Sequence, residues 1–124
     1  MANPITYLEI AGRDGDKLES FYSQLFGWQI ERRDEHNVGG NRYGSVKDGD
    51  AGPLNLGIRH EPQGKAELVF YIEVPDIEAA FAKAKELGAE ARIAPMQAPG
   101  VTFALIADPE GNTVGLVQKK QKDD

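Results

Sequence analysis

Residues 69–91 read VFYIEVPDIEAAFAKAKELGAEA, and the pattern in this stretch is the main evidence in the sequence for the fold. It opens as an apolar strand, passes through a Pro-Asp turn into a segment with apolar residues at helical spacing, and stops at a glycine. Residues 7–30, YLEIAGRDGDKLESFYSQLFGWQI, repeat the same order of strand, aspartate turn, helix and glycine. Because the order, the helix length and the stop signal agree together, the pattern indicates a duplicated module.

Both predicted helices have recognisable boundaries. Asp14 and Asp76 stand where an N-cap is expected, and Gly27 and Gly88 follow the last apolar residue of each helix. The spacing of the apolar residues predicts one buried stripe on each helix. We expect the sheets to bury the members of that stripe: Leu18, Phe21, Leu25, Phe26, Phe81, Ala84 and Leu87.

Short strand-like segments follow each helix. They are expected at residues 28–33, 43–46 and 54–58 in the first module, and at residues 89–93, 102–107 and 113–118 in the second. The sequence therefore predicts an α+β fold of two βαβββ modules, about residues 4–60 and 66–118, in one domain of 124 residues. The alternative, a ferredoxin-like α/β sandwich, leaves too many strand-like segments over.

Composition restricts the classes of function. The chain has a formal net charge of -6 and no cysteine. Phosphate contacts need clustered Lys and Arg, so we expect no nucleic-acid partner. Without cysteine there are no disulfides, thiol nucleophiles or cysteine-based zinc sites. No apolar run is long enough to cross a membrane and the first residues do not have the features of a signal peptide, so we expect a cytoplasmic protein without a membrane partner.

Three motifs carry a resemblance to a known family: FYSQLFGW at residues 21–28, IEVPDIEAA at 72–80 and DPEGNTVGL at 108–116. With them the chain resembles the vicinal oxygen chelate superfamily, the glyoxalase, bleomycin-resistance and extradiol-dioxygenase group, over nearly its whole length. The resemblance implies that two βαβββ modules form a curled mixed sheet around a concave cavity, with helices on the outer faces. It also implies a homodimer.

The resemblance further implies where a metal ion would be held. Metal-dependent members use a His on the first strand, a His or Gln on the equivalent strand of the second module, and a Glu on the last strand. By offset from the turn aspartates, these positions are Tyr7, Val69 and Gly115. None is a normal ligand for a divalent ion, although tyrosinate binds Fe(III). We therefore expect no metal site of the usual kind and no cofactor, with Gly115 leaving space in the cavity floor.

Strand alternation assigns side chains to the two faces of each sheet. Leu8 and Ile10 suit the helix-covered face, so Tyr7 and Glu9 are predicted to point into the cavity. The same reasoning places four more residues in the cavity: Val69, Tyr71, Glu73 and Gly115.

A small-molecule pocket combines apolar or aromatic walls with a few polar groups. The candidate ligand contacts of that kind are Tyr7, Tyr43, Asn55, Tyr71 and Phe103, and core packing is the alternative for each. Glu9 and Glu73 are two carboxylates in one cavity, which suits acid and base chemistry or an improvised metal site. The alternative for each is an ion pair or exposure at the rim. Glu9 is the better catalytic candidate because it adjoins Tyr7.

Two further features are expected to have no chemical role. His36 and His60 lie in loop-like segments and are predicted to be surface residues. Residues 37–44, NVGGNRYG, are glycine-rich but do not join a strand to a helix, as a phosphate-binding loop must. They are predicted to form a loop over the cavity mouth.

Three classes of function stay open. The first is a metal-free protein that binds a small, partly aromatic molecule in its cavity. The second is an enzyme of the superfamily, a lyase, isomerase or dioxygenase, with relocated metal ligands or with acid and base chemistry at Glu9. The third is a subunit or interaction domain whose cavity has no role.

Overall fold

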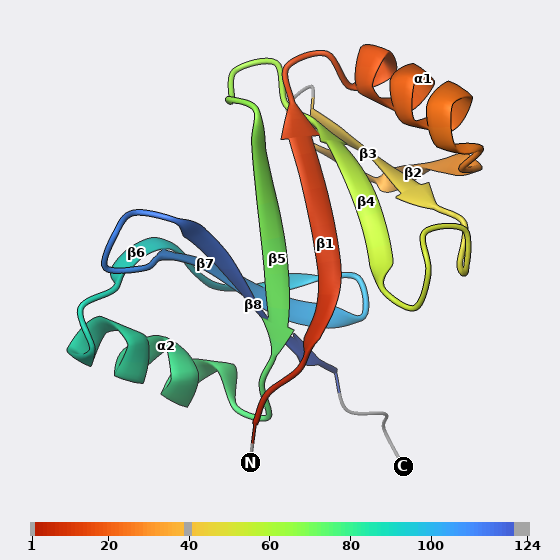
Figure 1. Cartoon of the computed structure of the whole chain (residues 1–124). Helices are drawn as coiled ribbons and strands as arrows, with labels where there is room; N and C mark the ends of the chain where they lie inside the picture. The colour runs from red at the N-terminus through yellow and green to blue at the C-terminus, as the bar shows by residue number, and fades with distance from the viewer. Residues whose placement is uncertain (1, 39–40, 121–124) are drawn as a thin grey trace. The chain divides into compact units, whose positions relative to one another are not determined.

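In the computed structural model, the described residues, 2–38 and 41–120, follow the order βαβββ-βαβββ (Figure 1). For residues 33–38 and 41 only the backbone is described. The first repeat comprises β1 (Ile5–Gly12), α1 (Gly15–Phe26), β2 (Ile30–Val38), β3 (Asn41–Val46) and β4 (Asn55–His60). The second comprises β5 (Glu67–Glu73), α2 (Ile77–Glu86), β6 (Glu90–Ala98), β7 (Val101–Ala107) and β8 (Thr113–Lys119). The duplicated α+β fold predicted from the sequence is confirmed, with more strands than a ferredoxin-like sandwich has.

The chain divides into two compact units. The first unit is Tyr7–Val69, and the second is Met1–Thr6 together with Phe70–Asp124. The N-terminal segment joins the second unit through the carbonyl of Pro4, which accepts a hydrogen bond of 2.9 Å from the backbone N–H of Glu73. The unit boundaries therefore fall inside β1 and β5.

The strands of the two units follow the same plan. In the first unit the order is β2-β3-β4-β1, with β1 parallel to β4 and the other neighbours antiparallel. In the second the order is β6-β7-β8-β5, with β5 parallel to β8. Glu9 is paired with Gly57 in one parallel pair, and Tyr71 with Gly115 in the other. The two glycines therefore occupy equivalent positions in the repeats.

Both helices begin and end where the sequence predicted. The carboxylates of Asp14 and Asp76 each accept a backbone hydrogen bond of 3.1 Å from the first turn of their helix. Gly27 ends α1 with a φ of 76°, and Gly88 follows α2 with a φ of 103°. Glycine adopts this left-handed conformation without the penalty that a Cβ would bring.

Each helix packs on the sheet of its own unit (Figure 1). Leu8 and Ile10 of β1 face Leu18 and Tyr22 of α1, so the predicted helix-covered face of this strand is confirmed. The core of the second unit is formed by buried residues of α2 and its strands: Val74, Ile77, Phe81, Ala104, Ile106, Val114 and Leu116. The faces predicted for Val114 and Leu116 are confirmed as well.

The buried stripe of each helix is narrower than predicted. Phe81 is buried, and Leu18 and Ala84 are half-buried against the cores. The predicted burial is wrong for four residues, whose exposed fractions are 55% for Phe21, 60% for Leu25, 56% for Phe26 and 70% for Leu87. Helix α1 approaches its sheet through Gly15, Leu18 and Tyr22, and the ring of Tyr22 stacks on Trp28 with centroids 5.4 Å apart. Periodicity identifies an apolar stripe, but not how much of it the sheet covers.

Several strands are longer than predicted. β2 extends to Val38 and pairs with β3, with Ile30 opposite Val46 at one end and Val38 opposite Asn41 at the other. The described part of residues 37–44 is therefore strand and not a loop. Gly39 and Gly40 lie outside the described residues. β4 extends through Arg59 to His60, a residue that the sequence placed in a loop-like segment. Antiparallel pairing satisfies backbone groups whatever the side chains, so these polar ends gave no apolar signal. Neither described helix is both long and apolar enough to span a membrane.

Candidate functional site

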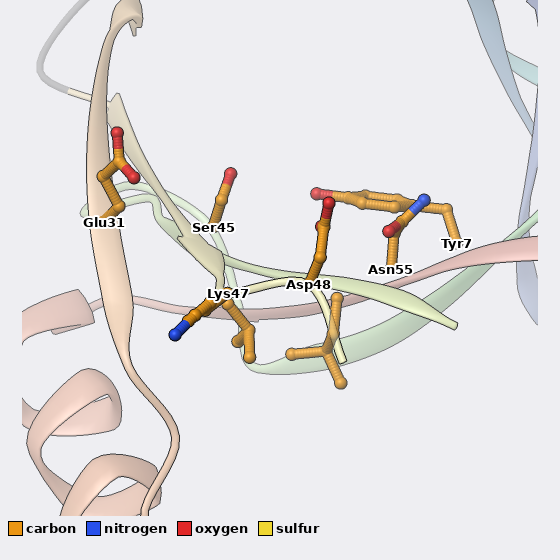
Figure 2. Close-up of a pocket in the computed structure, with 8 residues that line it drawn as sticks. Tyr7, Glu31, Ser45, Lys47, Asp48 and Asn55 are labelled. Atoms are coloured by element: carbon orange, nitrogen blue, oxygen red, sulfur yellow. The ribbon is translucent and has the colours of Figure 1, made fainter. Parts of the chain in front are cut away.

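A pocket of about 510 Å³ lies in the first unit, on strands β1 to β4 and the segment after β3 (Figure 2). Its polar residues are Tyr7, Glu31, Ser45, Lys47, Asp48 and Asn55. Val46 and Leu56 complete the lining. We call this site the β1–β4 pocket. The volume falls within the range of small-molecule sites.

Strand register explains why these residues meet. Tyr7 of β1 is paired with Asn55 of β4, and Glu31 of β2 is paired with Ser45 of β3. Because Leu8 faces the helix, its neighbour Tyr7 belongs to the opposite face of the sheet. Figure 2 shows the side chains of Tyr7, Ser45 and Asn55 on one side of the strands. The structure thus brings together two predicted ligand contacts, Tyr7 and Asn55.

One lining residue of the pocket, Tyr7, is aromatic, and a second tyrosine ring packs against it. The rings of Tyr7 and Tyr43 stack with centroids 6.4 Å apart and an interplanar angle of 19°. Gly57 makes this arrangement possible, because a Cβ there would overlap the hydroxyl groups of both tyrosines. Tyr43, a third predicted contact, therefore supports Tyr7 from the same face.

Glu9 is buried and ion-paired. Its exposed fraction is 5%, and its Oε1 lies 2.6 Å from Nη1 of Arg59. Arg59 also approaches Glu61 at 3.0 Å and Glu67 at 3.4 Å. A buried carboxylate needs such a partner. This geometry favours the ion-pair alternative for Glu9.

The remaining predicted site residues of the second unit have structural neighbours. Tyr71 is buried with its ring over Gly115, and a Cβ at Gly115 would overlap that ring. Glu73 lies 3.5 Å from the ammonium of Lys119. Phe103 is half-buried and paired with Val117 across β7 and β8. The expectation that Gly115 leaves an open space is therefore wrong, because the Tyr71 ring fills it.

The positions that the resemblance equates with metal ligands do not fit a divalent ion. Gly115 offers no donor atom and is covered by Tyr71. Val69 is apolar and fully buried in the first unit. Tyr7 has a phenol where imidazole is expected, and no group of three His, Asp or Glu residues in the described part of the chain is arranged to hold a metal.

His60 does not behave as the surface loop residue predicted from the sequence. It is the last residue of β4, and its Nδ1 accepts a hydrogen bond of 2.7 Å from the backbone N–H of Gly15, the first residue of α1. An accepting Nδ1 places the ring proton on Nε2. The histidine therefore anchors the start of α1 to the sheet. The side chain of His36 lies outside the described residues.

The sequence reasoning missed Glu31, Ser45, Lys47 and Asp48 as pocket residues. One signal was available, because Ser45 stands two positions from Tyr43 and so shares its face of β3. Glu31 follows from Ser45 only when the register of the β2–β3 hairpin is known. Lys47 and Asp48 lie beyond the end of β3, where alternation gives no information.

The model of the glyoxalase-like domain family matches residues 8–117. No curated protein matches the chain. A hypothetical protein from Bacillus halodurans C-125 has a similar structure, with a TM-score of 0.69 and 16% identity over 100% of this chain and 99% of that one.

Methylmalonyl-CoA epimerases also share the fold. The Streptomyces coelicolor enzyme, in complex with 2-nitronate-propionyl-CoA, has a TM-score of 0.67 and 18% identity over 100% of this chain and 99% of its own. The Mycobacterium tuberculosis enzyme has a TM-score of 0.66 and 14% identity over 94% and 88%. At such identities the likeness shows the fold alone. Since the family model covers most of the chain, the protein belongs to the glyoxalase-like domain family, within the vicinal oxygen chelate superfamily.

Proposed function

We propose that this protein binds a small, partly aromatic molecule in the β1–β4 pocket, without a metal ion at the positions used by metal-dependent relatives. The proposal rests on the ring of Tyr7, which stacks with Tyr43 and lies in one pocket with the polar groups of Ser45 and Asn55. An aromatic wall binds a planar group by stacking, and the polar groups orient it.

The chemistry of the equivalent metal positions supports the metal-free form of this proposal. Tyr7, Val69 and Gly115 supply one phenol, one apolar side chain and no side chain. The alternative is an enzyme with relocated ligands. Metal analysis of the purified protein separates the two, since a tightly held stoichiometric ion would favour the enzyme.

Ligand screening with pocket variants tests the proposal. Fragments that shift the thermal midpoint of the wild-type protein are titrated against Tyr7→Phe and Asn55→Ala. Each change removes one hydrogen-bonding group, so affinity should fall roughly fivefold. The matched controls are Tyr22→Phe on α1 and Gln63→Ala, both outside the pocket. Binding that is equally strong in all four variants would show that the molecule binds elsewhere.

The expected homodimer and the cytoplasmic location rest on the resemblance and the sequence, and we retain both as proposals. Sedimentation equilibrium tests whether the protein is a homodimer. A monomer at all accessible concentrations would contradict it.

A further inference from the structure

The charges around the β1–β4 pocket indicate the class of ligand it takes, if the proposed function is right. Two carboxylates, Glu31 and Asp48, and one ammonium, Lys47, line the pocket. In Figure 2 the carboxylates of Glu31 and Asp48 point to the side of the strands occupied by the Tyr7 ring, while the ammonium of Lys47 points away from it. The side on which a ligand would stack is therefore negative.

Two arginines near the pocket, Arg32 and Arg42, do not offset this negative charge. Arg32 is ion-paired with Asp16 and Glu19, and Arg42 with Asp16, so both are engaged by residues of α1. These two guanidinium groups hold the pKa of Asp16 below its usual value, that of Arg42 being the larger influence. The charges of Arg32 and Arg42 are thus already compensated by α1, and the side chain of Arg33 lies outside the described residues.

Arg59 is compensated as well. It shares β4 with Asn55 and lies among three carboxylates, those of Glu9, Glu61 and Glu67. One guanidinium cannot neutralise three carboxylates, so this neighbourhood also has a negative sum. The whole chain has a formal net charge of -6, which adds a field of the same sign.

The ring of Tyr7 suits a positively charged ligand as well. The face of a tyrosine ring is electron-rich and attracts a cation placed over it. Glu31 and Asp48 take part in no hydrogen bond or ion pair within the described part of the chain, so both carboxylates are available to an ammonium group. Asn55 and Ser45 add neutral oxygen acceptors beside them.

We infer that the β1–β4 pocket selects organic cations, with the aromatic part of the ligand on Tyr7 and its ammonium group beside the carboxylates of Glu31 and Asp48.

Three probes that share one phenyl ring and differ in charge test this inference: phenethylamine, 2-phenylethanol and phenylacetate. Each is titrated into isotope-labelled protein at neutral pH, and the shifts of the Tyr7, Ser45 and Asn55 amide signals report binding in the pocket. Because both carboxylates are exposed, the cation should bind roughly fivefold more tightly than the alcohol, and the anion most weakly. Added salt should reduce this preference.

Two charge-removing variants and one control complete the experiment. Glu31→Gln and Asp48→Asn should each lower the preference for phenethylamine over 2-phenylethanol while binding of the alcohol stays the same. Glu78→Gln on α2 removes the same charge from the chain outside the pocket, and it should keep the preference.

The outcomes separate the two claims. If all three probes shift the pocket signals with equal affinity, or if the anion binds best, the inference about charge is overturned while the proposed function stands. If no probe shifts these signals at saturating concentration, the proposed function fails and the inference fails with it.

Discussion

At the scale of single residues, two glycines on the strands leave the room that tyrosine side chains occupy. Gly57 and Gly115 occupy equivalent positions in β4 and β8. A side chain at either position would overlap a tyrosine ring or hydroxyl. The sequence predicted an open space at Gly115, and only the β5–β8 register shows that the Tyr71 ring fills it. That pairing joins residues far apart in the chain, so local patterns could not reveal it.

Gly115→Ala should destabilise the fold by about 1–3 kcal/mol, since the new methyl group meets the buried ring of Tyr71. Urea unfolding measures the change in free energy. In a Tyr71→Leu background, where the ring is absent, the cost should shrink. In a Tyr71→Phe background, which keeps the ring, it should not. An equal cost in all three backgrounds would show that Tyr71 does not fill this space.

Asp108 organises the turn before β8. Its Oδ1 accepts backbone hydrogen bonds of 2.9 Å from Glu110 and from Asn112, and its Oδ2 accepts one of 2.9 Å from the Asn112 side chain. The bond from the Asn112 side chain is the main reason that the pKa of Asp108 lies below its usual value. A lowered pKa means that the unfolded chain binds a proton more readily than the folded one.

The contribution of Asp108 to stability should therefore be complete above the usual aspartate pKa and disappear as the pH falls through that value and then the lower value of the folded state. Asp108→Asn removes the ionised acceptor, so wild type and variant should differ in unfolding free energy at neutral pH and converge in acid. Glu110→Gln, in the same turn, is the matched control. A difference that stays constant with pH would contradict this role.

At the scale of elements, the sequence predicted the boundaries of the helices well, but not how much of each helix surface the sheet buries. Asp14, Asp76, Gly27 and Gly88 mark the helix boundaries because capping is local chemistry. The exposure of Phe21 is different, because it depends on how closely α1 approaches β4 and on the packing of Tyr22 against Trp28. Neither of these can be read from the helix itself.

The same substitution on the two helices should have very different costs. Phe81→Ala should lower the free energy of unfolding by about 3–5 kcal/mol, because Phe81 is in the core of the second unit. Phe21→Ala should cost less than about 1 kcal/mol, since that ring is more than half exposed. Denaturant unfolding of both variants compares them directly. Equal costs would show that the packing of α1 is misassigned.

The hydrogen bond between His60 of β4 and Gly15 of α1 gives a second prediction at this scale. His60→Ala leaves the buried N–H of Gly15 without its acceptor, so the free energy of unfolding should fall by about 1–3 kcal/mol. For comparison, Asp14→Ala removes the N-cap of the same helix and should lower the free energy of unfolding by about 1 kcal/mol. Nitrogen NMR of wild-type His60 should show the proton on Nε2. A proton on Nδ1 would rule the bond out.

At the scale of the whole molecule, the repeat predicted the fold because each module carries its own strand, cap and stop signals. The site was only partly predictable. Tyr7 followed from alternation on its own strand, and Asn55 was a candidate by its residue type. Glu31 required the register of the β2–β3 hairpin, and the Glu9–Arg59 pair required the register of β1 with β4. The composition of the pocket therefore depends on pairing between strands that are separate in the sequence, which local patterns do not reveal.

The proposed function is that this protein binds a small organic molecule without a metal ion at Tyr7, Val69 and Gly115. Native mass spectrometry of the protein loaded with a fragment from the screen, before and after chelation, measures both ligands in one spectrum. We expect the added mass of the organic molecule, no stoichiometric metal, and no change in the spectrum on chelation. A stoichiometric divalent ion whose removal releases the organic ligand would contradict it.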